Sequence, residues 1–329
     1  MKISVVIPTL AADEALAQCL ESLSAQTFSG EFEVLVVDNS GGGKATAPPE
    51  VRVLHNTVNT GYGGGVNRGI AESTGDWILA LNDDTVLHPD CLAELYAAAT
   101  KRRDIGMCAP QIRQQQTNLI DSAGGLLIAR DGTSKQRGQG QPTDAFLRDL
   151  EVLFPSGCAA LYRRDMLEEI GLFEEPYFLY CEDTDLGLRA RWKAWECVYA
   201  SKAIVEHRYS HSSGGAASAL KAYYVERNRL RTVVRNFPFR DLLLSPFHTA
   251  ARYFWHLRYR GQGKGAAAQY NGRESLASIA FRAWKDTLFE LPTLWKQRKA
   301  IQSHTRLTPR QYSRLLASYR ISSKQVASL

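Results

Sequence analysis

Two acidic segments of the sequence contain the side chains best suited to catalysis. The first is an Asn-Asp-Asp segment at residues 82–84, and the second is a Glu-Asp pair at residues 182–183. The first follows an apolar run and the second an aromatic one. Carboxylates in such places serve binding or catalysis more often than they serve a core. The sequence therefore predicts a functional site at each segment.

The first segment offers the oxygen ligands that Mg²⁺ and Mn²⁺ prefer. Asn82, Asp83 and Asp84 form an Asn-x-Asp frame, which favours a metal ion that bridges a diphosphate. Such an ion would act as a Lewis acid on a leaving nucleoside diphosphate. The structural alternative is that Asp84 or Thr85 caps a helix that begins near residue 89.

The second segment is a candidate for the catalytic base. Residues 178–181 before it are aromatic and apolar, and such surroundings raise the pKa of a carboxyl group toward that of a general base. The alternative is that Glu182, Asp183 and Asp185 are first-turn acids of a helix, where the helix dipole favours negative charge.

Three further features of the sequence are candidates for the same functional sites. Asp38 follows an apolar run and could accept a hydrogen bond from the imide N–H of a uracil or thymine base, or else cap a turn. His207 also ends an apolar run and is a candidate metal ligand, although a single histidine is more often structural. The glycine-rich segment at residues 59–69 is either a turn or a place where the backbone approaches a nucleotide sugar, with Asn67 or Arg68 contacting polar groups.

The elements that must position these residues are typical of an α/β fold. Apolar runs that predict strands lie at residues 3–7, 32–37, 51–54, 77–81, 105–112 and 198–205. Helices are predicted at residues 13–25, 89–103, 164–170 and 182–194, and a short helix begins in the glycine-rich segment and closes at 69–73. A polar excursion at 114–150 is expected to contain a hairpin and a mobile loop around 134–142. Continuous apolar strands that alternate with helices indicate a mostly parallel sheet covered on both faces, and ligands bind at the carboxyl ends of its strands. Asp38 and the acids at 83–84 come at such ends.

Charge divides the 329 residues unevenly. The net charge is +6, but residues 216–329 contain 21 Lys and Arg against 5 Asp and Glu, and the preceding residues contain 19 against 29. We therefore expect a catalytic domain at 1–215 and a basic helical region at 216–329. The basic region favours an anionic partner such as membrane phosphates or a diphosphate substrate, the alternative being a solvated helical surface. It has no nucleic-acid recognition motif, so we expect no nucleic-acid partner.

The cysteines and the apolar runs bear on the compartment. Six scattered cysteines without a Cys-x-x-Cys pair predict reduced thiols and a cytoplasmic protein. The apolar run at the N-terminus is too short for a signal peptide and ends at Pro8. No run reaches the roughly 18 apolar residues of a spanning helix. Any membrane contact is therefore expected to be peripheral.

Taken together, these segments resemble the inverting glycosyltransferase family 2, which has the GT-A fold, and they are most similar to its bacterial rhamnosyltransferase-type members. The resemblance covers residues 1 to about 236. It rests on residues 5–9 (Val-Val-Ile-Pro-Thr), 36–40 (Val-Val-Asp-Asn-Ser), 59–69, 81–84 (Leu-Asn-Asp-Asp), 154–157 (Phe-Pro-Ser-Gly), 178–189 and 224–228 (Tyr-x-x-Arg-Asn).

The resemblance implies a role for each candidate residue. Asp84, the last residue of the family's Asp-x-Asp, would bind Mn²⁺ or Mg²⁺, and His207 would complete the metal site. Asp183, in a Glu-Asp motif with Glu182, would be the general base. The residues expected to bind the nucleotide sugar are Pro8, Thr9, Asp38, Asn67, Asn82 and Asp83, with Asp38 on the pyrimidine base. Asn82 stands where many relatives have Asp, which puts the metal affinity in question.

The resemblance also implies the reaction. A single base on the face of the sugar opposite the leaving diphosphate permits one in-line displacement, which inverts the configuration at C1. We expect L-rhamnose to move from dTDP-rhamnose to a sugar hydroxyl of a polyprenyl-diphosphate-linked or cell-surface polysaccharide precursor. The alternatives are a UDP-sugar donor (N-acetylglucosamine, galactose or glucose) and a non-catalytic module that binds a nucleotide sugar or a polysaccharide.

Aromatic and basic residues alternate at 237–247 and 253–260, as they do in interfacial helices. They predict a peripheral contact with the inner face of the cytoplasmic membrane, beside a polyprenyl-diphosphate-linked acceptor. The alternative is that these helices pack on the catalytic domain or in a homodimer.

Overall fold

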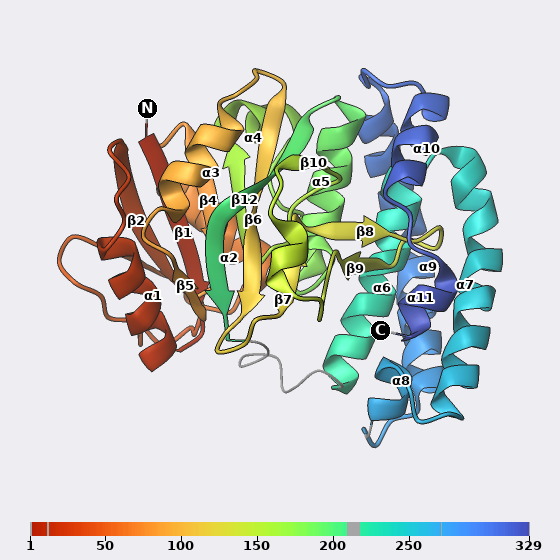
Figure 1. The fold of residues 1–329 in the computed structure, drawn as a ribbon. Coiled ribbons are helices and arrows are strands. Elements are labelled where there is room, and N and C mark those ends of the chain that lie inside the picture. Colours follow the sequence, from red (N-terminus) through yellow and green to blue (C-terminus); the bar gives the residue numbers. More distant parts are fainter. Residues whose placement is uncertain (1, 12, 209–217, 271, 329) are drawn as a thin grey trace. The chain divides into compact units, whose positions relative to one another are not determined.

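The computed structural model describes residues 2–11, 13–208, 218–270 and 272–328 (Figure 1). The chain forms two compact units that are interleaved along the sequence. The first unit comprises Met1–Leu126, Gln136–Phe178 and Trp195–Tyr209, and the second comprises Leu127–Lys135, Leu179–Ala194 and Ser210–Leu329. The boundary expected between residues 215 and 216 falls inside the segment 209–217, which lies outside the described residues.

A ten-stranded sheet forms the centre of the first unit, in the order β10-β12-β6-β11-β4-β1-β2-β3, with β5 paired to β12 and β7 to β6. The strands are β1 (Lys2–Thr9), β2 (Glu31–Asp38), β3 (Arg52–His55), β4 (Trp77–Leu81), β5 (Thr85–Leu87), β6 (Ile105–Gln114), β7 (Ile120–Ala123), β10 (Leu150–Val152), β11 (Ala159–Arg163) and β12 (Glu196–His207). β1, β2, β3 and β4 pair in parallel, as do β6 and β12. β11 is antiparallel to both β4 and β6, so β1 to β4, β6 and β12 all point the same way.

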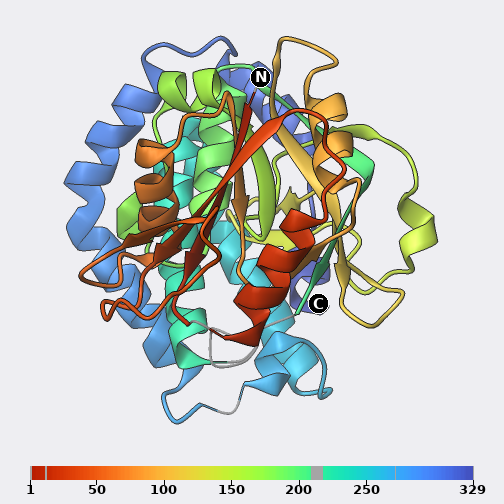
Figure 2. The same ribbon diagram turned by 90° about the vertical axis from the view of Figure 1, so that its left-hand side faces the viewer.

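Helices cover both faces of this sheet, as Figure 2 shows for its N-terminal strands. They are α1 (Glu14–Ser24), α2 (Gly61–Glu72), α3 (Cys91–Ala99) and α4 (Arg164–Ile170). Apolar side chains of α1 and α3 pack with alternate residues of the strands in one buried core. On the other face α2 lies against β1, where a Cβ added at Gly69 would come within 2.2 Å of Val6 Cγ1. Glycine at this position therefore permits the close approach.

The second unit is mostly helical, as the sequence predicts for the basic region. Its helices are α5 (Glu182–Trp192), α6 (Ala219–Asn236), α7 (Phe239–Arg260), α8 (Ala266–Gln269), α9 (Leu276–Gln302), α10 (Pro309–Ser318) and α11 (Ser323–Ser328). It also contains most of the hairpin formed by β8 (Leu126–Ile128) and β9 (Ser134–Gln136).

Buried polar and aromatic contacts hold α5 within this unit. Asp185 is fully buried and lies 2.9 Å from Arg189 Nε and 3.0 Å from Arg235 Nε. These arginines hold the pKa of its carboxyl group below the usual value although burial opposes this. Trp192, at the end of α5, stacks on Tyr312 with ring centroids 3.8 Å apart. Asp185 is thus an anchor of the helix.

Candidate active site

The carboxyl ends of the parallel strands bring together the first group of predicted residues. Thr9 ends β1 and pairs in register with Asp38, which ends β2. Asn82 directly follows β4, and His207 ends β12. Because these strands point the same way, the four residues lie along one edge of the sheet.

His207 lies between two buried carboxylates. Its Nε2 is 3.3 Å from Asp84 Oδ1, and its Nδ1 is 2.8 Å from Asp121 Oδ2. Burial alone would lower the pKa of His207, but Cys158 and the carboxylates of Asp121 and Asp84 raise it well above its usual value. The contact with Asp84 is close but not aligned as a hydrogen bond, so Asp84 Oδ1 has no hydrogen-bond partner among the described residues.

Asp83 points to a different partner. Its Oδ2 accepts a hydrogen bond from Thr9 Oγ1 at 2.6 Å. Burial raises the pKa of Asp83 to about 6, against this hydrogen bond and with help from the charge of Asp84. The carboxyl groups of Asp83 and Asp84 therefore have different surroundings, although the two residues are neighbours in the sequence.

The helix-capping alternative for this segment does not match the structure. The N-cap of α3 is Asp90, not Asp84 or Thr85. Thr85 Oγ1 instead donates to the carbonyl oxygen of Asn82 at 2.7 Å. This leaves the Asp84 side chain directed at His207.

Asp38 caps the turn that follows β2. Its carboxylate accepts hydrogen bonds from Ser40 N at 2.8 Å and from Ala45 N at 2.9 Å, and His55 Nδ1 lies 3.2 Å away. Burial favours the neutral acid, yet these bonds hold the pKa of Asp38 well below its usual range. The turn-capping role is thus observed, and contact with a pyrimidine base stays a prediction.

Two other predicted donor-site residues make packing contacts. Pro8 is buried, and a Cβ added at Gly65 of α2 would lie 2.8 Å from its Cβ. Asn67 donates to the carbonyl oxygen of Phe173 at 2.9 Å and to Glu175 Oε1 at 3.2 Å, so it fixes the loop at 173–175. Their binding of a nucleotide sugar stays a prediction.

The second acidic segment begins α5 after an unusual stretch of backbone. Phe178, Tyr180 and Cys181 have φ angles of 64°, 67° and 67°. Non-glycine residues adopt such left-handed angles at a cost, and they gather at functional sites. The buried Asn228 side chain donates to the carbonyl oxygens of Leu179 at 2.7 Å and Tyr180 at 2.8 Å, which holds this stretch in place.

Glu182 and Asp183 have different surroundings. Glu182 is buried, its Oε2 has no hydrogen-bond partner among the described residues, and burial together with the charge of Asp183 raises its pKa to about 8. Asp183 Oδ1 accepts hydrogen bonds from Thr184 N at 2.6 Å and Thr184 Oγ1 at 3.2 Å. Thr184 Oγ1 in turn lies 3.1 Å from Ser134 Oγ. At neutral pH Glu182 is therefore mostly protonated.

Comparison with known proteins decides the family. The family model for glycosyl transferase family 2 matches residues 4–171. The chain belongs to glycosyltransferase family 2. It is similar to the N-acetylglucosaminyl-diphospho-decaprenol L-rhamnosyltransferase of Mycobacterium tuberculosis, with 34% identity over 248 residues, which cover 67% of this chain and 80% of that protein. The uncharacterized glycosyltransferase YwdF of Bacillus subtilis is 27% identical over 201 residues, 58% of this chain and 68% of that protein.

Solved structures confirm the predicted GT-A fold of this family 2 glycosyltransferase. GalNAc-T7 with UDP, GalNAc and Mn²⁺ has a TM-score of 0.58 at 15% identity, over 93% of this chain and 58% of that one. The mannosyltransferase PcManGT from Pyrobaculum calidifontis, in complex with GDP-Man and Mn²⁺, has a TM-score of 0.50 at 12% identity, over 96% of this chain and 78% of that one.

The residues at the sheet edge fit a divalent metal ion. No group of three His, Cys, Asp or Glu side chains forms a complete metal site within the described parts of the chain. Asp84 Oδ1 and His207 Nε2, 3.3 Å apart, supply two donors. Two neighbouring ligands at about 2.1 Å from an octahedral ion are roughly 3 Å apart, and Mg²⁺ commonly takes its other ligands from water and substrate phosphates. Asp121, bound to Nδ1, leaves Nε2 as the nitrogen available to a metal.

Sequence reasoning did not find three residues that position this family 2 site. Asp121 lies in the excursion at 114–150, where a hairpin is expected without assigned strand positions, and its acidic type after an apolar residue is the one available signal. Asn228 belongs to the Tyr-x-x-Arg-Asn segment, which the resemblance includes without a role. Ser134 carries no signal, because its contact with Thr184 depends on the tertiary fold.

Proposed function

We propose that the protein is a metal-dependent inverting glycosyltransferase that moves L-rhamnose from dTDP-rhamnose to a sugar hydroxyl of a polyprenyl-diphosphate-linked glycan. The observation that carries the proposal is the 34% identity, over 67% of the chain, to a transferase named for L-rhamnose and for an N-acetylglucosaminyl-diphospho-decaprenol acceptor. Membership of a glycosyltransferase family removes the support for a non-catalytic binding module.

Asp183 is proposed as the general base. Its carboxylate takes the proton of the acceptor hydroxyl while that oxygen forms a bond to C1 of the sugar. The bond from C1 to the diphosphate oxygen breaks, and the leaving dTDP keeps the electron pair. One displacement of this kind inverts the configuration at C1. Glu182, mostly protonated beside it, keeps a second negative charge away from the base.

Asp84 and His207 are proposed to hold the metal ion, Mn²⁺ or Mg²⁺. A bound ion would neutralise the charge that develops on the leaving diphosphate. Thr9 and Asp83, joined at 2.6 Å, together with Asn82 stand at the same edge of the sheet and are proposed to contact the donor. Asn82 makes no side-chain hydrogen bond to any other described residue, so its amide is available to a ligand.

The proposal is tested by screening donors with purified protein. Thermal shift with Mn²⁺ or Mg²⁺ should show stabilisation by dTDP-rhamnose, since a ligand at 100 times its Kd adds about 2.7 kcal/mol. Transfer to a short-chain N-acetylglucosaminyl-diphospho-lipid should follow, and a chelator should abolish it. Transfer from UDP-N-acetylglucosamine, UDP-galactose or UDP-glucose in place of dTDP-rhamnose would establish the alternative donor.

We also propose a peripheral contact between the second unit and an anionic membrane. No described helix has the length and hydropathy to cross a bilayer. Large apolar side chains instead stand exposed along two helices: Phe239, Leu243, Phe247, Phe254 and Leu257 on α7, and Phe281, Leu288, Phe289 and Trp295 on α9. Exposed basic residues accompany them at Arg240, Arg258 and Arg260 on α7 and at Arg282, Lys285, Lys296 and Lys299 on α9.

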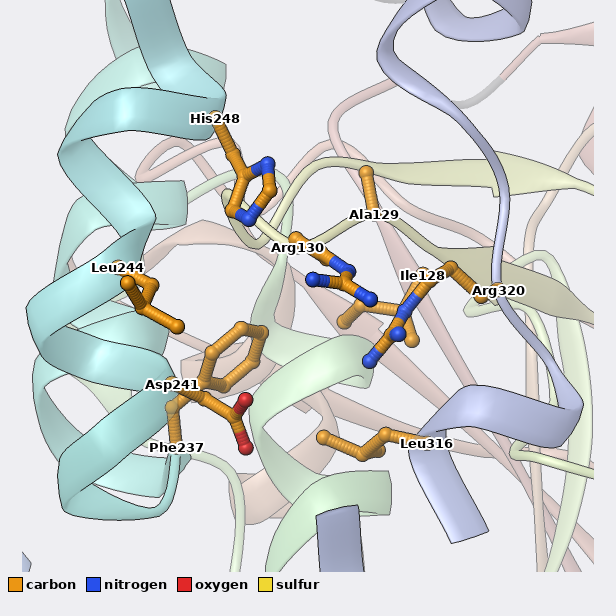
Figure 3. Close-up of a pocket in the computed structure, with 9 residues that line it drawn as sticks. All are labelled: Ile128, Ala129, Arg130, Phe237, Asp241, Leu244, His248, Leu316 and Arg320. Carbon is orange, nitrogen blue, oxygen red and sulfur yellow. The ribbon is translucent and has the colours of Figure 1, made fainter. Parts of the chain in front are cut away.

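The acids of these two helices bind partners within the unit. Asp241 Oδ2 accepts a hydrogen bond from Ser313 Oγ at 2.5 Å, and Figure 3 shows Asp241 directed into a pocket lined also by Arg130 and Arg320. Asp286 accepts one from Tyr223, and Glu290 one from Arg231, each at 2.6 Å. The exposed faces are thus aromatic and basic, which complements anionic lipid headgroups.

Sedimentation with liposomes tests this contact. The protein should pellet with phosphatidylglycerol vesicles at low salt and less with phosphatidylcholine vesicles. Replacing Phe247 and Phe254 with Ser should reduce pelleting, whereas Leu147→Ser, at an exposed leucine of the first unit, should not. Failure to pellet with anionic vesicles would contradict the contact, and a mass that doubles with concentration would indicate a homodimer through these faces.

A further inference from the structure

The carboxyl edge of the sheet continues past Asn82 and Thr9 to two further strand ends. β4, β1, β2 and β3 are neighbours in that order, and Asp38 and His55, the last residues of β2 and β3, pair in register. Successive strands lie about 4.8 Å apart, so the edge from β4 to β3 spans roughly 14 Å. An extended nucleoside diphosphate has a comparable length. Its base would therefore lie near the end of β3 when its diphosphate lies near the end of β4.

The carboxylate of Asp38 is closed to a base. Its side chain is only 1% exposed, and its two oxygens already accept hydrogen bonds from the backbone N–H groups of Ser40 and Ala45. The side chain of His55, by contrast, is 51% exposed and places Nδ1 3.2 Å from Asp38 Oδ2. Of the two, His55 is therefore the side chain that a base can reach.

Asp38 determines which nitrogen of His55 carries the proton. Burial would raise the pKa of Asp38, but hydrogen bonds from Ala45, Ser40 and His55 hold it well below the usual range, so the carboxylate is ionised at neutral pH. An ionised carboxylate only accepts hydrogen bonds, so His55 Nδ1 has to be the donor. In a neutral imidazole with its proton on Nδ1, Nε2 keeps a lone pair and is an acceptor. This Nε2 makes no hydrogen bond to any other described residue.

Pyrimidine bases differ in what they offer to such an acceptor. Thymine and uracil carry a hydrogen on N3, between two carbonyl groups, whereas N3 of cytosine has a lone pair. An acceptor at Nε2 therefore forms a hydrogen bond with thymine or uracil and is opposed by the lone pair of cytosine. A site that is built to bond one polar group of a ligand rejects the analogue that lacks it.

We propose that Nε2 of His55 accepts a hydrogen bond from the imide N3–H of the donor's thymine or uracil base, and that Asp38 positions His55 for this contact. This inference rests on the proposed function and names the side chain that recognises the base. It replaces the direct contact between Asp38 and the base, which the resemblance implies, with a contact through His55. The pair selects against cytidine diphosphates and treats dTDP and UDP alike.

Calorimetric titration with nucleoside diphosphates tests the inference, at a fixed Mn²⁺ concentration and at about pH 8, where an ordinary imidazole is neutral. The wild type should bind dTDP and UDP with affinities within about twofold of each other, and dCDP about tenfold or more weakly. N3-methyl-dTDP, which lacks the imide hydrogen, should bind about three- to tenfold more weakly than dTDP, the loss expected for one hydrogen bond.

Variants of His55 assign this preference to its side chain. His55→Phe keeps a ring and removes the acceptor, so its affinity for dTDP should fall about three- to tenfold, and dTDP and N3-methyl-dTDP should then bind alike. His55→Gln keeps an oxygen acceptor and should retain part of the preference for dTDP. His304→Phe, at an exposed histidine of the second unit, is the control and should match the wild type.

Asp38→Asn tests the positioning role separately. An amide donates as well as accepts, so it no longer forces the proton onto Nδ1 of His55. The ratio of the affinities for dTDP and dCDP should therefore fall toward one. A merely structural loss would weaken the binding of both nucleotides alike and leave this ratio unchanged.

Other results overturn the inference. Equal binding of dTDP and N3-methyl-dTDP by the wild type, or an undiminished preference for dTDP in His55→Phe, removes His55 from the base site. An unchanged ratio of dTDP to dCDP affinity in Asp38→Asn removes Asp38 from the positioning role.

The same variants separate this inference from the proposed function. If the protein transfers a sugar from a UDP donor and not from dTDP-rhamnose, and His55→Phe loses the preference for the imide, the rhamnose donor fails and the base contact stands. If the protein transfers rhamnose from dTDP-rhamnose and His55→Phe keeps the preference, the base contact fails alone.

Discussion

The two acidic sites are built in opposite ways. The site of Asp84 is a product of sheet topology, because the ends of parallel strands place Thr9, Asn82 and His207 on one edge. The site of Asp183 depends on three left-handed residues before α5 and on Asn228, 45 positions further along the chain.

This difference predicts how each site responds to change. The sheet edge is supported by a buried core of strands and helices. A single polar substitution at this edge should therefore alter ligand affinity more than backbone conformation. Asp183, the proposed base, follows a strained segment that is held by hydrogen bonds from Asn228, so a distant substitution should move Asp183 itself. The variants below test this contrast in order of their expected effect on turnover.

Removing the proposed base should have the largest effect on turnover. Asp183→Asn keeps the shape of the side chain and abolishes its ability to take a proton, so kcat should fall about 10² to 10⁴-fold. Binding of dTDP-rhamnose, measured by calorimetry, should stay unchanged. A variant with near-normal kcat would remove Asp183 from the role of base.

Weakening the hydrogen bond that orients His207 should have the next largest effect on turnover. Asp121→Asn weakens the hydrogen bond to His207 Nδ1, which is 2.8 Å long in the native protein. Affinity for Mn²⁺, followed by electron paramagnetic resonance of the free ion, should fall about 10 to 100-fold. Excess Mn²⁺ should restore much of the activity. Equal Mn²⁺ affinity in variant and wild type would show that Asp121 has a structural role only.

Releasing the strained segment should cost turnover severalfold and also stability. Asn228→Ala leaves the carbonyl oxygens of Leu179 and Tyr180 without their donor, which should lower the free energy of unfolding by about 1 to 3 kcal/mol. The kcat should fall while Mn²⁺ affinity stays constant, and exposed Asn118→Ala serves as the control. A loss of stability with full kcat would mean that the segment does not position the base.

Neutralising Glu182 should affect turnover least, within about threefold, and should alter the pH dependence of stability. The pKa of Glu182 is about 8 in the folded protein, above the value of about 4.5 for an unperturbed Glu. The wild type therefore loses stability as pH rises from about 4.5 to 8, because ionisation favours the unfolded state. Glu182→Gln should melt close to the wild type at pH 5 and above it at pH 8.

Thermal unfolding across this range, with Glu50→Gln at an exposed glutamate as the control, measures the effect. A constant difference in Tm between pH 5 and pH 8 would contradict the assignment of a protonated Glu182.

The sheet and its edge were largely predictable from the sequence because they follow from local apolar runs. The strand predicted at 77–81 and the helix predicted at 164–170 match β4 and α4 residue for residue. The short helix expected to begin in the glycine-rich segment is present as α2, but it already starts at Gly61, and its glycines let it pack against Val6 and Pro8 of β1. Local propensity gave no sign of that tertiary contact.

The partners of the site residues were less predictable. The resemblance assigned roles to Asp84, His207 and Asp183, but Asp121 reaches His207 only because β7 pairs with β6, which lies beside β12. Positive φ angles at Phe178, Tyr180 and Cys181 run against residue preference, and hydrogen bonds from Asn228 stabilise the segment. Long-range contacts of this kind leave no periodic signal in a single sequence.

The anomeric configuration of the transferred sugar tests the account most directly. Wild-type protein, Mn²⁺ or Mg²⁺, dTDP-rhamnose and a short-chain N-acetylglucosaminyl-diphospho-lipid are combined, and the product is read by nuclear magnetic resonance. The account predicts one rhamnosyl product with the configuration at C1 opposite to that of the donor, and no product from Asp183→Asn in the same time. A product with the donor's configuration would contradict a single displacement with Asp183 as base.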